Sequence, residues 1–118
     1  MKALAVILAL VALPVSAESL FCVFNMECLN QEACAATEYG FEIIREDGVA
    51  RIETPSETLI AAEVQGESAD VHAYATPLGP SGVHLVTVFA DGAAVYTNHT
   101  WFDEPFAITY HGACEGKL

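Results

Sequence analysis

The sequence predicts an all-β fold, a single small antiparallel β-sandwich or barrel of about seven or eight short strands stapled by disulfides. Runs of β-branched and aromatic residues recur along the chain with turn residues between them, and no long amphipathic helical pattern interrupts them. Two Asp-Gly pairs, at 47–48 and 91–92, favour tight hairpins, because type I′ turns need positive φ at both central residues. All four cysteines fall within residues 22–114, as expected for a small cross-linked domain.

The N-terminal residues 1–17 predict a secretory signal peptide. Lys2 supplies the positive charge, residues 3–13 form the apolar core, and residues 15–17 (Val-Ser-Ala) form a small-residue cleavage site. The apolar run is shorter than the about 20 residues of a membrane span, and no membrane span is predicted elsewhere. We therefore expect residues 18–118 to form one all-β domain that is periplasmic or secreted, and the short signal favours a bacterial envelope.

The chain is strongly acidic. Without Lys2, three basic residues remain against 16 acidic residues, a net charge of −13. Nucleic-acid binding uses a basic face to neutralise phosphates, so this charge argues against a nucleic-acid partner. The charge serves solubility alone, or it serves recognition of a basic partner or a cation.

The four cysteines, Cys22, Cys28, Cys34 and Cys114, predict two disulfides, because an even count in a short exported domain is typical of a disulfide framework. We favour a local Cys28–Cys34 bridge and a Cys22–Cys114 bridge that ties the first strand to the last. Pairing of Cys34 with Cys114 is the alternative. A zinc site is the competing use, but the spacings lack the close pairs of zinc modules.

The first half of the domain is expected to contain one hairpin whose register can be read from its turn. Across Asp47-Gly48, Glu46 pairs with Val49, and Ile43 then stands opposite Ile52. Asn30 is a candidate N-cap for a single helical turn up to residue 36. Further strands are predicted at 20–26, 58–64 and 69–76, and a Pro- and Gly-rich loop at 77–82.

The stretch 83–110 predicts an antiparallel meander of three strands. A two-residue loop at Asp91-Gly92 places His84 opposite His99. The second turn holds Pro105, which disfavours a three-residue loop ending in a left-handed residue, because proline fixes φ at a negative value. We therefore expect a two- or four-residue loop at this turn. Alternation then predicts one inward face that contains His84, Val86, Val88, Val95, Thr97, His99, Trp101, Phe106, Ile108 and Tyr110.

His84 and His99 are the sharpest candidate site in this meander. Directly opposed residues have Cβ atoms about 4.5–5.5 Å apart, so two imidazoles there can ligate one Zn or Cu ion, with His72 or a carboxylate as a third ligand. Otherwise no cofactor is expected. A pH-responsive pair is a second interpretation, because two adjacent imidazoles cannot both be charged cheaply. The third is that both are half-buried sheet residues without a ligand.

Ser81 precedes His84 by three residues, but no nucleophile motif accompanies it. No serine lies in a G-x-S-x-G elbow, and the cysteines are expected to be oxidised. We therefore expect a protein without catalytic activity.

Trp101 and Phe102 stand before the turn Asp103-Glu104-Pro105. Large aromatic residues are often buried, so both are candidates for the core. Alternatively, an aromatic and acidic loop tip suits partner binding, because aromatic side chains are enriched among interface hot spots. Together with Ser81 they are the predicted partner-binding residues.

Two segments resemble the small exported β-barrel proteins that inhibit lysozymes. Residues 80–83 (Pro-Ser-Gly-Val) form a Ser-Gly loop before a strand, and residues 110–114 (Tyr-His-Gly-Ala-Cys) end in a cysteine that ties down the chain end. The Ser-Gly repeat and the following aromatic residue of those inhibitors are missing, and the four cysteines are arranged differently. The resemblance implies an inhibitor-like role, and the acidic charge would suit a basic lysozyme.

These observations favour an exported, non-catalytic binding or interaction module of the bacterial envelope, with a protein or small-molecule partner that is basic. The alternative is a metal-binding or pH-responsive periplasmic protein that uses His84 and His99.

Overall fold

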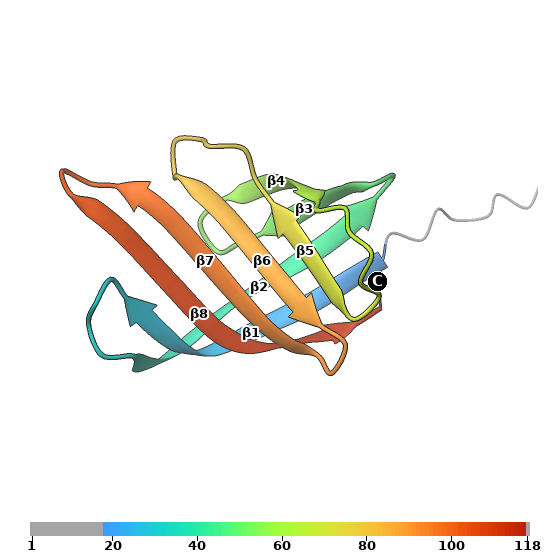
Figure 1. The fold of residues 1–118 in the computed structure, drawn as a ribbon, viewed down its shortest axis with the longest axis horizontal. Coiled ribbons are helices and arrows are strands. Elements are labelled where there is room, and N and C mark those ends of the chain that lie inside the picture. The colour runs from blue at the N-terminus through green and yellow to red at the C-terminus, as the bar shows by residue number, and fades with distance from the viewer. Residues whose placement is uncertain (1–17, 118) are drawn as a thin grey trace, which may run out of the picture.

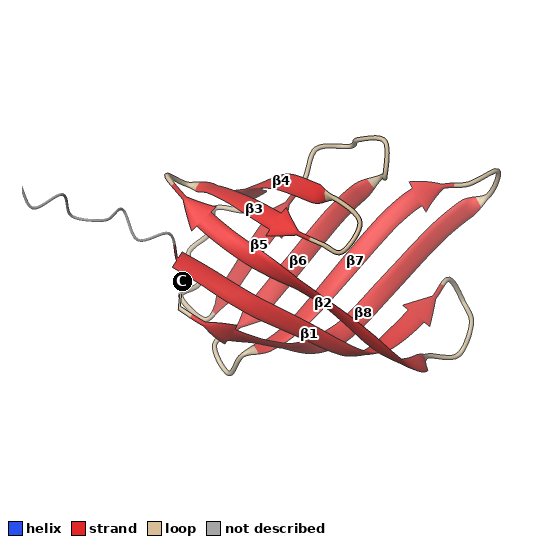
Figure 2. Cartoon of the chain, turned by 180° about the vertical axis from the view of Figure 1, so that it is seen from behind, coloured by secondary structure: helices blue, strands red, loops and turns tan. Residues whose placement is uncertain are grey.

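The chain forms a closed barrel of eight antiparallel strands (Figures 1 and 2). The computed structural model describes residues 18–117; the predicted signal peptide, residues 1–17, lies outside them, as does Leu118. Strands adjacent in sequence are adjacent in the sheet, and β8 returns to pair with β1, so the sheet is closed. The β4–β5 pairing is the shortest, at two positions. The predicted fold class is confirmed. The strands are β1 (Glu18–Leu29), β2 (Ala35–Glu46), β3 (Val49–Glu53), β4 (Thr58–Glu63), β5 (Val71–Ala75), β6 (Val83–Phe89), β7 (Ala93–Trp101) and β8 (Pro105–Gly116).

The core fills the inside of the barrel with alternate residues of each strand. On β1, for example, Cys22 and Phe24 are buried while Phe21 and Val23 are exposed, because successive side chains of a strand point to opposite faces. An aromatic cluster occupies one part of this interior, with rings 4.7–6.4 Å apart between centroids. Its members are Phe24, Tyr39, Phe41, Tyr96 and Tyr110.

Both favoured disulfides are confirmed. Cys22 is bonded to Cys114 across paired positions of β1 and β8, where the Cα atoms lie 4.0 Å apart. Cys28 is bonded to Cys34 across the β1–β2 loop. The first bridge closes a loop of 92 residues at the seam of the barrel, and such long loops give the largest loss of unfolded-state entropy.

The β2–β3 hairpin has the predicted register. Glu46 pairs with Val49 and Ile43 with Ile52. Asp47 and Gly48 have φ values of 50° and 78°, as a two-residue type I′ loop requires. Ile43 and Ile52 are both fully buried, so the turn and the apolar pattern agree.

The β6–β7 hairpin does not have the predicted register. His84 pairs with Asn98, and His99 pairs with Val83. The loop has three residues, 90–92, with Gly92 at φ 90° and its N–H bonded to the Phe89 carbonyl at 2.9 Å. A type I turn followed by a left-handed glycine also closes a hairpin, and here it shifts the pairing by one residue.

The β7–β8 hairpin also differs from the prediction. Its loop has three residues, 102–104, and Trp101 pairs with Pro105. The left-handed residue is Asp103, at φ 59°, in the middle of the loop, so the proline after it imposes no conflict. The two shifts cancel between β6 and β8, whose predicted inward faces are correct, but they turn β7 inside out. Ala94 and Tyr96 are buried, and Val95, Thr97, His99 and Trp101 point outward.

The predicted helical turn after Asn30 is absent. Asn30 adopts φ 49°, a left-handed conformation that asparagine tolerates better than most residues. Its side-chain Oδ1 accepts the Ala107 N–H at 2.8 Å, and its own N–H donates to the Ala107 carbonyl at 2.7 Å. Asn30 thus ties the β1–β2 loop to β8 instead of starting a helix.

The barrel has two unlike ends (Figure 1). One end, which we call the loop end, carries the four loops 30–34, 54–57, 76–82 and 102–104. The opposite end holds both ends of the described chain and carries the connections 47–48, 64–70 and 90–92.

Candidate functional site

His84 is the only buried polar residue in the described part of the chain, with 4% of its surface exposed. It lies near the start of β6, beneath loop 76–82, and points into the barrel because it alternates with the inward residues Val86 and Val88. Its imidazole is parallel to the ring of Tyr96, with an interplanar angle of 5°. A buried imidazole needs hydrogen-bond partners, and those partners define the site.

Four side chains form one continuous hydrogen-bonded series. Nδ1 of His84 lies 2.6 Å from the Tyr96 hydroxyl, and Nε2 lies 2.9 Å from Ser81 Oγ. Ser81 Oγ in turn lies 2.9 Å from Oε1 of Glu57. The series therefore runs from the core to the surface of the loop end, and its members come from β7, β6, loop 76–82 and loop 54–57.

The direction of each hydrogen bond in the series can be assigned by starting from Glu57 at its surface end. An ionised carboxylate only accepts, so the single Ser81 hydroxyl hydrogen points to Glu57. Nε2–H of His84 then donates to Ser81 Oγ, and Nδ1 accepts from the Tyr96 hydroxyl. Each donor has an acceptor when the imidazole is neutral.

The electrostatics agree with a neutral imidazole. Burial lowers the pKa of His84, and the nearby Glu57 carboxylate opposes that shift only in part. Burial also raises the pKa of Tyr96, so its hydroxyl keeps the proton that it donates. In this arrangement His84 is a donor toward Ser81, and the series orients the serine hydroxyl toward Glu57.

Asn98 fixes the loop above this series. Its side-chain N–H groups donate to the Ser81 carbonyl at 2.9 Å and to the Val83 carbonyl at 3.3 Å. Gly79 and Gly82 exchange two backbone hydrogen bonds of 3.0 Å, which leaves Pro80 and Ser81 at the tip. Gly82 has φ 97°, and a Cβ there would collide with the His99 carbonyl oxygen. Only glycine fits at this position.

The outer surface beside this loop is apolar. Leu78, Trp101 and Phe102 are 81%, 69% and 66% exposed. Leu78 and Trp101 line the same hollow of about 460 Å³, together with His99. Contiguous exposed apolar patches are a common feature of interaction surfaces.

The loop end is also acidic. Its four loops contain Glu32, Glu57, Asp103 and Glu104 and no lysine, arginine or histidine. The described basic residues lie elsewhere. Arg45 and Arg51 are already paired with Glu63 at 3.2 Å and Glu53 at 3.0 Å, and Lys117 follows β8 at the opposite end.

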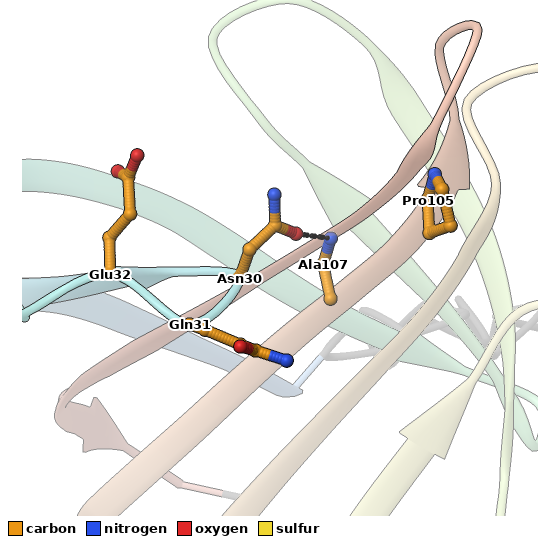
Figure 3. Close-up of a pocket in the computed structure, with 5 residues that line it drawn as sticks. All are labelled: Asn30, Gln31, Glu32, Pro105 and Ala107. Carbon is orange, nitrogen blue, oxygen red and sulfur yellow. Dashed lines mark hydrogen bonds between the residues drawn. The ribbon is translucent and has the colours of Figure 1, made fainter.

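A second hollow opens between the β1–β2 loop and β8, lined by Asn30, Gln31, Glu32, Pro105 and Ala107 (Figure 3). Figure 3 shows the hydrogen bond from Ala107 to Asn30 across it. Its volume is about 680 Å³, but it is open and its side chains are few. Its polar side chains are the amides of Asn30 and Gln31 and the carboxylate of Glu32.

The structure brings together some of the predicted site residues and separates others. Ser81 and His84 are in contact. His84 and His99 lie on opposite sides of the sheet, because His99 pairs with Val83 and neighbouring positions alternate. The predicted joint metal site of these two histidines is therefore not formed. In residues 18–117 no group of three His, Cys, Asp or Glu side chains is arranged to hold a metal ion.

Sequence reasoning missed three members of the site. Tyr96 and Asn98 were placed on the other face by the one-residue error in β7, and a three-residue loop at 90–92 would have identified them. Glu57 is 24 residues from Ser81 in the sequence, and no local pattern signals that contact. The alternative of a buried Trp101 and Phe102 is wrong, because both side chains are exposed.

Comparisons with protein-family models, curated proteins and solved structures found no match to this chain. Residues 18–117 contain no helix with the length and apolar character needed to cross a membrane.

Proposed function

We propose that this protein is an exported, non-catalytic binding module of the inhibitor-like kind, and that its loop end binds a basic protein. The observation that carries the proposal is the coincidence of exposed Leu78, Trp101 and Phe102 with an acidic set of loops that has no basic residue. Apolar anchors surrounded by charge are the ordinary composition of a protein-binding surface.

The charge distribution favours a basic partner over a neutral one. With a net charge of −13 outside the predicted signal peptide, the field of the whole molecule attracts cationic proteins over a distance of about 8–10 Å at physiological salt. At the loop end this field is not offset by local cations. Such complementarity raises association rates and excludes acidic competitors.

The rigidity of the loop end supports a preformed binding surface. The loops are held by the Asn30–Ala107 hydrogen bonds, the Gly79–Gly82 bridge and the Ser81–Glu57 contact. A surface that is already ordered loses less conformational entropy on binding. This is the property that an inhibitor or a scavenging module needs.

The two disulfides are compatible with an oxidising extracellular or periplasmic location. We place the protein there, as the predicted signal peptide implies, and basic lysozymes are the first partners to test. The acidic loop end and the resemblance at residues 80–83 both motivate that choice.

The test is a binding assay of the purified protein against a panel of basic lysozymes, with cytochrome c as a basic control protein. We expect a dissociation constant of micromolar or below for at least one lysozyme, and an association rate that falls as salt is raised. A Leu78→Ala and Trp101→Ala double variant should weaken that binding at least tenfold. Binding no tighter than that of cytochrome c, or binding unchanged in the double variant, would refute the proposal.

A second candidate function, pH-responsive binding, is favoured by His84 alone. Its ring lies directly beneath the Ser81 loop, so protonation would disturb the series that reaches Glu57. Binding measured at pH 7.5 and pH 5.0 in wild type and in His84→Gln tests this idea. It requires a pH-dependent affinity that the variant loses, and equal pH dependence in both proteins would contradict it.

A further inference from the structure

A pocket of about 330 Å³ lies on the other side of loop 76–82 from the Trp101 hollow. It is bounded by loop 54–57, the start of β4 and the underside of the Ser81 loop. Its walls are mainly apolar and its polar groups few. The lining residues that enter the argument below are the apolar Leu59, Ile60, Pro77 and Pro80 and the polar Glu57 and Ser81.

Among residues 18–117, Glu57 and His84 are the acidic and basic residues that line this pocket. Its position is fixed twice. Thr54 and Glu57 are joined by backbone and side-chain hydrogen bonds of 2.8–3.0 Å across their turn, and Ser81 Oγ donates to Oε1. Glu57 makes no ion pair with any residue in the described range 18–117. One carboxylate oxygen is thus oriented by the protein and the other is available to a ligand.

The chemistry of the walls defines what fits beside that carboxylate. Leu59, Ile60 and the two prolines offer apolar contact to an alkyl chain, and Glu57 offers a charged acceptor near its end. Long basic side chains combine these features, because they bury an aliphatic stem and keep a cationic head. A hydrogen bond between such a cation and a carboxylate is roughly twice as strong as a neutral one.

We propose that the Glu57 pocket receives an arginine or lysine side chain of the basic partner. This inference rests on the proposed function and names the group that the loop end recognises. In the complex, Glu57 pairs with the cation while Leu78 and Trp101 hold the apolar surface on the other side of the same loop. Ser81 also positions Glu57, because its hydroxyl donates to Oε1, and His84 supports Ser81 through Nε2.

The direct test uses N-acetyl-arginine methylamide as the probe and N-acetyl-citrulline methylamide as its neutral analogue. Both are titrated into ¹⁵N-labelled protein at constant ionic strength and followed by amide chemical shifts. We expect saturable shifts at Glu57 and Ser81 with the arginine probe, with an affinity in the millimolar range, and at least tenfold weaker binding of citrulline. Equal shifts with both probes would overturn the proposal.

Two matched variants separate the pocket from general electrostatics. Glu57→Gln and Glu104→Gln each remove one negative charge from an exposed position of the loop end. We expect Glu57→Gln to weaken arginine-probe binding at least tenfold and Glu104→Gln to change it less than twofold. Retained amide spectra in both variants show that the barrel is folded. An equal loss in the two variants would overturn the assignment to Glu57.

The same variants distinguish failure of the pocket from failure of the proposed function. If a lysozyme binds and Glu57→Gln and Glu104→Gln have the same affinity, the pocket is refuted and the binding function stands. If the arginine probe binds at Glu57 but no basic protein binds, the proposed function fails and the pocket remains as a site for a cationic group.

Discussion

The β2–β3 and β6–β7 hairpins both turn at Asp-Gly, yet only one of them uses the two-residue loop that this dipeptide favours. In the first, Asp47 and Gly48 are both left-handed. In the second, only Gly92 is left-handed, and Asp91 instead accepts the Ala93 N–H on its side chain at 2.9 Å. The same dipeptide therefore supports two registers that differ by one residue.

The barrel interior accounts for the choice at each hairpin. In β2–β3 the two-residue loop already turns Ile43 and Ile52 inward. In β6–β7 the two-residue loop would turn Val95 and Thr97 inward and leave Tyr96 in water. The three-residue loop buries Tyr96 in the aromatic cluster and puts its hydroxyl on His84. Burial of a large aromatic side chain outweighs a preference between two common turns.

The largest effect expected from this comparison is the loss of Tyr96. Tyr96→Ala should lower the free energy of unfolding by about 3–5 kcal/mol, the usual cost of removing a buried aromatic ring. Val95→Ala, the adjacent change on the outer face, should cost below about 1 kcal/mol. Urea unfolding with the disulfides intact measures both. A larger loss of stability in Val95→Ala than in Tyr96→Ala would argue for the two-residue loop and its register.

The glycines of the two turns should give the next effect. Gly48 and Gly92 both have positive φ, so alanine at either costs roughly 1–2 kcal/mol of backbone strain. A Cβ on Gly48 meets nothing within 4 Å, but one on Gly92 would lie 3.2 Å from the Cys114 carbonyl oxygen. Gly92→Ala should therefore be the more destabilising in the same urea assay. Gly66→Ala, in open space without a positive φ, is the control and should be close to neutral. Equal losses at 48 and 92 would argue against the close packing of the β6–β7 loop on β8.

The smallest change in the free energy of unfolding should come from the protonation of His84. Because burial lowers its pKa in the folded state, the unfolded chain, with a pKa of about 6.5, binds the proton first as the pH falls. Stability should therefore decrease from about pH 6.5 downward until the folded-state pKa is passed, and be little affected above pH 7.5. Unfolding free energies measured between pH 5 and 8 should show this slope in wild type and in His99→Gln, and a reduced slope in His84→Gln. Parallel curves for all three proteins would contradict the inward position of His84.

Much of the fold was predictable because its signals are local. Alternation identified the strands, Asp47-Gly48 gave a correct register, and even spacing of short strands indicated a sandwich or barrel. The favoured disulfides followed from placing Cys22 in the first strand and Cys114 in the last. Of the candidate site, Ser81 and His84 were named, and they are in contact.

The sequence by itself determined which residues of each strand share a face, and that the chain would fold as a cross-linked, acidic β domain. Only the tertiary structure decided which face of β7 turns inward and that Glu57 meets Ser81. The physical reason is the same in both cases. Alternation along a strand does not show which of its two faces is buried, because a one-residue shift in pairing exchanges them. A contact between distant loops depends on barrel closure, which no local propensity encodes.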